Sequence, residues 1–314
     1  MKVYRSFEEV EHIPYPVVTT GSFDGVHVGH KVIINRLNQL ASEIGGESVL
    51  ITFYPHPRKV LYPDTAGKNL KLLTSENEKI DLLRSTGLDN LIIINFTLEF
   101  SKTSPGEFVE KYLLKKLNAS IIVVGFNHFF GHNREGNYDY LLQLQEKYGF
   151  RVEEIPEQDI QHECVSSTRV RKALNEGDIQ RASAYMEHFY IMRGKLSRGH
   201  GLLDEEGIIT LKISLEEEMK LIPVQGVYAI RLETGSHSLK GILNIKDNTL
   251  DKPEKYRFPL VEFILVDDCI ENIEGKQGTI YFHKRIRECR HFDSPQKLKK
   301  QIKSDIRLTE ELIY

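Results

Sequence analysis

Apolar positions follow two alternating patterns over the first 187 residues. Short continuous apolar runs predict buried strands over 16–18, 48–53, 91–96, 121–125 and 151–155. Apolar residues three or four positions apart predict helices over 33–44, 74–83, 105–117 and 138–148, and a helix with its continuation from 166 to about 187. Strands that alternate with helices predict a parallel sheet covered on both faces.

The pattern changes after Glu187. Residues 190–195, 208–213, 226–232, 239–245, 260–266 and 279–286 read as strands separated by turn residues, and residues 294–312 read as a last helix. This pattern is typical of an antiparallel sheet or small barrel. We therefore predict an α/β + β fold, with a Rossmann-like parallel-sheet domain over 1–187 and a β-barrel with a terminal helix over 188–314.

Composition narrows the class of protein. A length of 314 residues favours two domains. The net charge of −3 gives no basic field for nucleic acid. The N-terminal residues lack the apolar region expected of a signal peptide, and no apolar run approaches the length of a membrane span. Three cysteines without a C-x-x-C pair fit a reducing cytoplasm. We expect a cytoplasmic protein that acts on small molecules, without a nucleic-acid or membrane partner.

The stretch 20–30 carries the clearest chemistry. It joins a predicted strand to a predicted helix, and it contains the glycines Gly21, Gly25 and Gly29. Glycines let a ligand approach the backbone, and a helix N-terminus suits phosphate. His27 and His30 can donate hydrogen bonds to phosphate oxygens and stabilise developing charge. The pattern is neither a dinucleotide fingerprint nor a P-loop.

Two further stretches suit a phosphorylated ligand. Pro55-His56-Pro57 follows a predicted strand, at the sheet edge where ligands collect in α/β folds. Ser166–Arg171 opens a helix with natural N-cap hydroxyls, but its two arginines lie where the helix dipole disfavours them. A bound polyanion removes that conflict, and arginines that point to water are the alternative. His128 and His132 read as loop residues rather than a metal pair.

The chain resembles the prokaryotic riboflavin kinase/FMN adenylyltransferase family, also called FAD synthetase. The motifs that carry the resemblance stand in order over roughly the first 185 residues and include a nucleotidyltransferase H-x-G-H signature. They are Gly21–His30, Thr52–Pro57, Leu73-Thr74-Ser75 with Glu78-Lys79, Phe96-Thr97 with Glu99-Phe100-Ser101, Gly125 with Asn127, Phe130-Gly131 with Arg134 and Gly136, and Ser166–Arg171. The family usually has an aromatic residue where this chain has His128.

The resemblance implies transfer of AMP from ATP to FMN, which yields FAD and pyrophosphate. It implies catalytic roles for His27, His30, Asn127 and Arg169. It implies ATP or phosphate contacts for Gly21, Phe23, Gly25, Gly29, Ser166, Ser167, Thr168 and Arg171. It implies flavin contacts for Asp24, Pro55, His56, Pro57, Asn127 and Arg134. Mg²⁺ is expected mainly on phosphates and waters, without a dedicated set of protein ligands.

The second domain departs from the family pattern. The family's barrel phosphorylates riboflavin with a Gly-Phe-Pro-Thr-Ala-Asn signature that holds metal and ATP. Here residues 199–210 read Gly-His-Gly-Leu-Leu-Asp-Glu-Glu-Gly-Ile-Ile-Thr, and Glu205 and Glu206 would repel triphosphate. Glu262 falls at the position of the family's general base and reads as a vestige on an outward face. We expect a barrel that keeps its fold, lacks most or all kinase activity, and serves in flavin binding, structure or oligomerisation.

Three alternatives remain open at this level. The first is a fully bifunctional enzyme in which Asp204, Glu205 or Thr210 replaces the missing metal ligands. The second is a flavin-binding sensor or scaffold with a silent catalytic site. The third is a nucleotidyltransferase for another substrate, such as a phosphopantetheine or nicotinamide mononucleotide, which the H-x-G-H signature alone allows.

Overall fold

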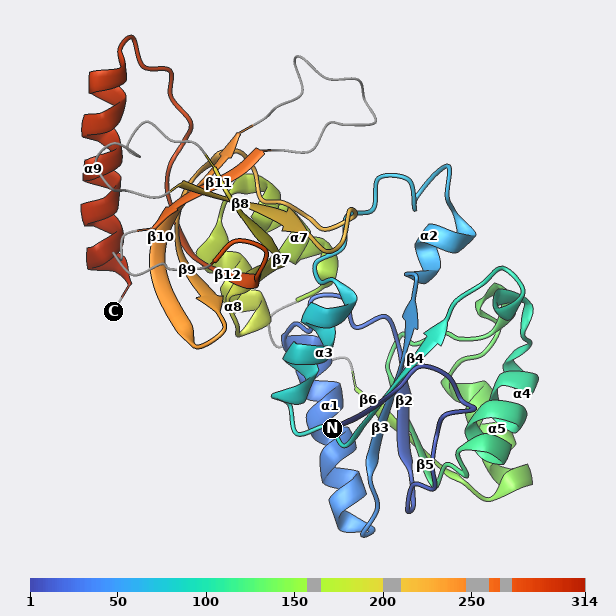
Figure 1. Cartoon of the computed structure of the whole chain (residues 1–314). Coiled ribbons are helices and arrows are strands. Elements are labelled where there is room, and N and C mark those ends of the chain that lie inside the picture. Colours follow the sequence, from blue (N-terminus) through green and yellow to red (C-terminus); the bar gives the residue numbers. More distant parts are fainter. Residues whose placement is uncertain (157–164, 200–209, 247–259, 266–272, 314) are drawn as a thin grey trace. The chain divides into compact units, whose positions relative to one another are not determined.

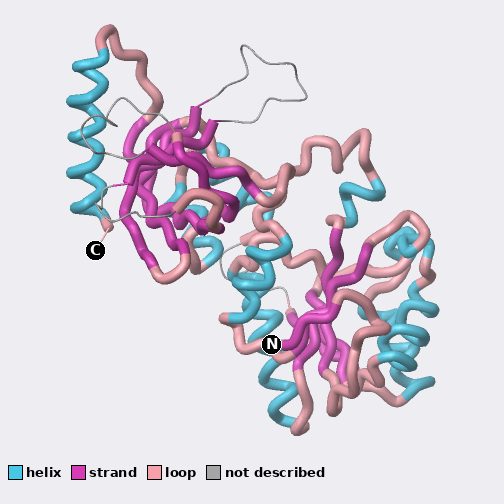
Figure 2. The backbone as a smooth tube through the Cα atoms, in the orientation of Figure 1, coloured by secondary structure: helices cyan, strands magenta, loops and turns pink. Residues whose placement is uncertain are grey.

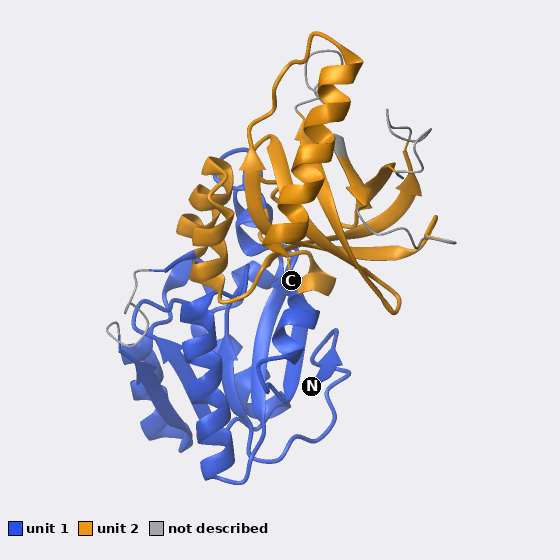
Figure 3. Cartoon of the chain, turned by 90° about the vertical axis from the view of Figure 1, so that its left-hand side faces the viewer, with its two compact units in different colours: residues 1–71, 79–166 blue, residues 72–78, 167–314 orange. Residues whose placement is uncertain are grey.

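The computed structural model describes residues 1–156, 165–199, 210–246, 260–265 and 273–313. Contacts divide the chain into two compact units (Figure 3). Unit 1 comprises residues 1–71 and 79–166, and unit 2 comprises residues 72–78 and 167–314. The short stretch 72–78 therefore leaves the first unit and returns to it, which the sequence pattern does not indicate.

Unit 1 is built on a six-stranded sheet in which every pairing is parallel (Figures 1 and 2). The strand order is β1-β4-β3-β2-β5-β6. The strands are β1 (Lys2–Tyr4), β2 (Val17–Thr20), β3 (Ser48–Tyr54), β4 (Asn90–Asn95), β5 (Ile121–Gly125) and β6 (Arg151–Ile155). Apart from the edge strand β1, these confirm the predicted strands and the predicted parallel sheet.

Helices cover both faces of this sheet. One face packs against α1 (Val28–Glu43) and α3 (Glu76–Arg84) through a cluster that includes Leu37, Leu40 and Leu83. The other face packs against η2 (Phe108–Lys116) and α5 (Tyr138–Tyr148). Central strands are apolar at consecutive positions because each face has its own core.

The helix predicted over 105–117 has an unexpected form. Ser104 caps a single α-helical turn, α4 (Pro105–Glu107), and the chain then continues as η2 with π-type hydrogen bonds. The last of these runs from the amide of Leu117 to the carbonyl of Tyr112, at 3.2 Å. The buried Val109 and Leu113 of η2 are four positions apart, a spacing that also occurs on one face of an α-helix.

Unit 2 is built on a closed antiparallel barrel, as predicted. The strand order around it is β10-β11-β8-β7-β12-β9, and β9 pairs with β10 to close the ring. The strands are β7 (Tyr190–Arg198), β8 (Thr210–Leu215), β9 (Gly226–Thr234), β10 (His237–Lys246), β11 (Leu260–Leu265) and β12 (Gln277–Arg287). Because the barrel is closed, none of these strands is an edge strand. The terminal helix α9 (Pro295–Leu312) packs on β10 and β12.

Two helices precede the barrel within unit 2. The predicted helix and its continuation are α7 (Ser167–Glu176) and α8 (Ile179–Met186). They separate at Gly177, whose φ of 78° ends α7, and at Asp178, whose carboxylate caps α8. Both helices contribute to the barrel's apolar cluster, so the compact units divide the chain differently from the boundary predicted near Glu187. The functional domains over 1–187 and 188–314 stay a prediction.

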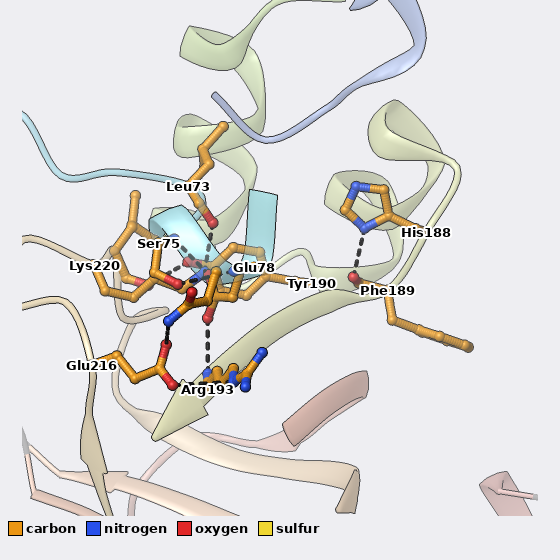
Figure 4. Close-up of polar contacts among 11 residues, drawn as sticks. Leu73, Ser75, Glu78, His188, Phe189, Tyr190, Arg193, Glu216 and Lys220 are labelled. Carbon is orange, nitrogen blue, oxygen red and sulfur yellow. Dashed lines mark hydrogen bonds and ion pairs between the residues drawn. The ribbon is translucent and has the colours of Figure 1, made fainter. Parts of the chain in front are cut away.

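A buried ion pair fastens residues 72–78 within unit 2 (Figure 4). The Lys220 ammonium donates to Glu78 Oε2 at 2.5 Å and to the carbonyl of Leu73 at 2.6 Å. Glu78 also accepts hydrogen bonds from the amides of Ser75 and Arg193, both at 2.8 Å. Both charged side chains are 1% exposed. A buried charge requires hydrogen-bond partners, and the hydrogen bonds around Glu78 and Lys220 supply them.

Candidate active site

The order of the strands reverses beside β2. The chain leaves β2 toward β3 on one side and returns later to β5 on the other side, so the order reverses between β2 and β5. In open α/β sheets, ligands bind outside the carboxyl ends of the strands at this reversal. The turn after β2 and the loop after β5 therefore lie at the position that the fold favours for a ligand.

The turn after β2 has an unusual backbone. Phe23, Gly25 and Val26 have φ angles of 46°, 89° and 42°, in the left-handed region. Each non-glycine residue held there costs on the order of 1 to 3 kcal/mol, and for a β-branched valine this conformation is rare. Phe23 and Val26 stay in place because their side chains are buried in the core beneath α1. Phe23 is only 3% exposed, so its predicted ATP or phosphate contact would fall to its backbone, and that contact stays a prediction.

The two histidines lie together at the start of α1. Their rings stack with centroids 3.6 Å apart, and Phe23 packs against His30 at 4.7 Å. His27 is the residue that precedes the first helical residue, and its side chain is 7% exposed. Burial, together with His27 and Lys79, holds the pKa of His30 well below its usual value. His30 is thus neutral at neutral pH and retains one N–H donor.

Glycine is required at two of the predicted phosphate-binding positions for two different structural reasons. Gly25 has the positive φ angle given above, which glycine adopts without strain. A side chain at Gly21 would meet the Phe23 ring at 2.8 Å, so a small residue is required there. Gly29 is buried in the first turn of α1, and Asp24 is buried within the turn. Their predicted ligand contacts stay predictions.

Sequence reasoning missed the group that holds this turn. The carbonyl of Ser22 accepts a hydrogen bond from Thr52 Oγ1 at 3.1 Å and another from Lys79 Nζ at 2.7 Å. Thr52 lies in β3 and is buried, and Lys79 lies in α3. The available signal was Glu78-Lys79, which the family resemblance includes without a role.

Two more segments follow strands that end at the same edge of the sheet. Pro55, His56 and Pro57 follow β3, where His56 accepts a hydrogen bond from the amide of Arg58 and precedes α2 (Pro57–Leu61). The loop after β5 contains the exposed Asn127, and in it the Arg134 guanidinium lies 4.8 Å from the centroid of the exposed Phe129 ring. Parallel strands β2, β3 and β5 all end here, so their loops share this edge.

His128 has a defined place in this loop. Its Nε2 lies 3.2 Å from Thr20 Oγ1 at the end of β2, and burial, with the nearby Arg134, lowers its pKa to about 4. His132 instead lies near the carbonyl of Ser101 at 3.1 Å. In the described part of the chain, no group of three or more histidine, cysteine or acidic side chains could hold a metal ion. Binding of Mg²⁺ mainly to ATP phosphates and waters stays a prediction.

The remaining predicted phosphate residues stand at the start of α7. Ser167, Thr168, Arg169 and Arg171 belong to unit 2, whereas Ser166 belongs to unit 1. A pocket of about 240 Å³ between α7 and α8 is lined by Arg169, Lys172, Ala173, Glu176, Arg181 and Tyr185. The site as described in unit 1 thus contains the histidines and the three loops, and the triphosphate role of the α7 residues stays a prediction.

Within the barrel, the Glu262 carboxylate forms an ion pair. It lies in β11 opposite Lys212 of β8, and the Lys212 ammonium is 3.5 Å from its carboxylate. Thr210, a candidate replacement ligand, is buried, and its hydroxyl has no hydrogen-bond partner among the described residues. Asp204, Glu205 and Glu206 lie outside the described residues, as does most of the stretch that replaces the kinase signature.

Comparisons with known proteins match both halves of the chain. A family model for FAD synthetase matches residues 11–169, and one for riboflavin kinase matches residues 186–313. A bifunctional riboflavin kinase/FMN adenylyltransferase of Buchnera aphidicola subsp. Acyrthosiphon pisum is 30% identical, covering 99% of this chain and 98% of its own length. The chain belongs to the riboflavin kinase/FMN adenylyltransferase family. The family resemblance predicted from the motifs is therefore confirmed.

Other members of the riboflavin kinase/FMN adenylyltransferase family are similarly close. The protein of that name from Bacillus subtilis is 31% identical over 92% of this chain and 90% of its own length. A crystal structure named "Macrolide-efflux Protein from Streptococcus pneumoniae" has a TM-score of 0.84 and 24% identity, and covers 98% of both chains. At that identity it supports the fold alone.

The lowered pKa of His128 predicts that acid destabilises unit 1. A folded-state pKa of about 4 for His128, against an unfolded value of 6.5, makes the unfolded chain bind more protons below pH 6.5. Stability contributed by neutral His128 is complete above pH 6.5 and is lost as the pH falls toward 4. We expect a loss of about 2 kcal/mol from this group, because its partial exposure reduces the full linkage value.

Urea unfolding at several pH values between 7.5 and 4 tests this expectation. His128→Gln should flatten the acid limb of the stability curve, while the exposed His12 changed to Gln should leave it unaltered. An acid limb with the same slope in His128→Gln and in the wild type would contradict the assignment.

Proposed function

We propose that the protein transfers AMP from ATP to the phosphate of FMN, producing FAD and pyrophosphate. The observation that carries this proposal is the pair of stacked histidines at a glycine-rich turn outside β2, at the point where the strand order reverses. Membership of the riboflavin kinase/FMN adenylyltransferase family supports ATP and FMN as the substrates.

The reaction needs alignment more than it needs a base. An oxygen of the FMN phosphate is already ionised near neutral pH and attacks the α-phosphorus of ATP. The new P–O bond forms as the bond between the α-phosphorus and the bridging oxygen breaks, and pyrophosphate leaves with that electron pair. A neutral imidazole N–H can stabilise the charge that develops on the phosphate oxygens. His27 and His30 suit this role because both stand at a helix N-terminus.

We further propose that the barrel has lost most or all kinase activity. The Pro-Thr-Ala-Asn signature is absent from the chain, and Glu262 is paired with Lys212. Riboflavin would have to compete with that ammonium for the carboxylate. The alternative, a fully bifunctional enzyme, is favoured by the riboflavin kinase model that matches residues 186–313. A flavin-binding sensor or scaffold is the third possibility.

A product assay separates these functions. Purified protein is incubated with ATP and Mg²⁺ and either riboflavin or FMN, and the flavins are resolved by liquid chromatography. We expect FAD from FMN and unchanged riboflavin. FMN from riboflavin would establish the bifunctional alternative. Failure to form FAD from either oxidised or reduced FMN would overturn the proposed reaction and favour the sensor.

The predicted location and partners follow from the same proposal. Both substrates are small cytoplasmic molecules, which supports a cytoplasmic protein without nucleic-acid partners. Among the described residues, no helix is long and apolar enough to cross a membrane. Flavin binding by the barrel stays part of the proposal.

A further inference from the structure

The turn that carries the two histidines needs contacts from other parts of the chain to hold its backbone. Phe23 and Val26 hold left-handed backbone angles that neither side chain favours. A conformation of this kind persists only where surrounding contacts fix it. The side chains of Phe23 and Val26 are fixed by the core, but the backbone between β2 and Phe23 must also be held so that the histidines keep their orientation.

The support at Ser22 is a two-donor clamp. Its carbonyl accepts from the Lys79 ammonium at 2.7 Å and from the Thr52 hydroxyl at 3.1 Å, and these two donors are themselves 3.4 Å apart. The contacts lie in a partly buried region, where a charged hydrogen bond is stronger than it is in water. Lys79 is therefore the charged member of the clamp.

Lys79 stands on a well-fixed helix start. Ser75 and Glu78 form a reciprocal capping box, with Ser75 Oγ accepting from the Glu78 amide at 3.2 Å and Glu78 Oε2 accepting from the Ser75 amide at 2.8 Å. The following residue, Ile80, is buried in the core beneath α1. The backbone on both sides of Lys79 is thus held, and its ammonium reaches Ser22 from a fixed base.

The same ammonium acts on His30 through its charge. Desolvation of the half-buried His30 imidazole lowers its pKa, and the nearby His27 and Lys79 lower it further. The Nδ1 atom of His30 makes no hydrogen bond among the described residues. The Lys79 ammonium acts on that ring electrostatically and helps to lower its pKa.

We propose that Lys79 is a positioning residue for adenylyl transfer, which holds the Ser22 carbonyl and thereby orients His27 and His30. This inference rests on the proposed function. A displacement of about 1 Å in a catalytic group can cost on the order of 100-fold in rate, so loss of the clamp should appear in kcat. A lysine that instead bound ATP phosphate directly would contribute mainly to ATP affinity.

Three variants test the assignment. Lys79→Met removes the ammonium, Lys79→Arg retains a cationic donor, and Arg84→Met removes an exposed charge from the same helix as a matched control. We measure kcat for FAD formation, the dissociation constant for ATP by calorimetry, and the imidazole pKa of His30 by nitrogen NMR. Circular dichroism establishes that each variant is folded.

The expected result is a loss of at least roughly tenfold in kcat for Lys79→Met with less than about a threefold change in ATP affinity. The pKa of His30 should rise in that variant, Lys79→Arg should restore part of kcat, and Arg84→Met should match the wild type. An unchanged kcat, or a loss confined to ATP affinity, overturns the inference. If the wild type forms no FAD, the proposed function fails. The NMR spectra of His30 then test the Lys79 clamp by themselves. An unchanged His30 pKa in Lys79→Met would overturn the clamp.

Discussion

His27→Ala and His30→Ala are each expected to lower kcat for FAD formation by on the order of 100- to 1,000-fold, the usual cost of removing one donor to a developing oxyanion. The two rings stack at 3.6 Å at the start of α1, where a phosphate would meet them. Because the attacking phosphate needs no base, the loss should persist across the neutral pH range. Initial rates of FAD formation at saturating ATP and FMN measure the effect.

A matched control is available in the same unit. His12 is exposed and lies before β2, so His12→Ala should retain wild-type kcat. His30 is half-buried and packs against the core residue Phe23, so its removal leaves space there and thermal unfolding must accompany the rates. A folded His27→Ala protein with unchanged kcat would remove His27 from the mechanism, and the same result for His30→Ala would remove its partner.

Lys220→Met is expected to cost about 3 to 5 kcal/mol of unfolding free energy, because it leaves the buried Glu78 carboxylate without its countercharge. The barrel-facing segment 72–78 would also lose the hydrogen bond from Lys220 to the Leu73 carbonyl. Burial already raises the pKa of Glu78, against the opposing effect of Lys220. In the variant that pKa should rise further, so the destabilisation should shrink as the pH falls and Glu78 takes up a proton.

Denaturant unfolding at pH 7.5 and pH 5.5 measures both effects. Lys246→Met changes an exposed lysine of β10 and serves as the control, with an expected cost within about 0.5 kcal/mol. The double variant Lys220→Met/Glu78→Gln should recover much of the loss, since no buried charge remains. A single variant as stable as the control would show that the ion pair contributes little to this fold.

Much of the architecture could be predicted because local patterns and the fold agree. The apolar runs of β3, β4 and β5 belong to strands covered on both faces, and the alternating runs after Glu187 belong to a barrel. The glycine-rich turn and its two histidines could be located because they occur between a strand and a helix. Each of these features is encoded within a few consecutive residues.

Features that depend on distant residues could not be predicted. Glu78 and Lys220 are 142 positions apart, and nothing near either one in the sequence indicates a buried partner. Lys79 reaches Ser22 across 57 positions, so a motif could mark it without giving its role. The division between α7 and α8 was encoded locally by Gly177-Asp178, but their packing with the barrel depends on apolar contacts from many strands.

The most direct test of the central claim follows the phosphorus atoms of ATP. Wild-type protein receives riboflavin and FMN together, with Mg²⁺ and ATP labelled either at the α- or at the γ-phosphorus. The proposed adenylyl transfer predicts α-label in FAD and γ-label only in pyrophosphate. An absence of α-label from FAD would contradict adenylyl transfer, and γ-label in FMN would contradict the loss of kinase activity.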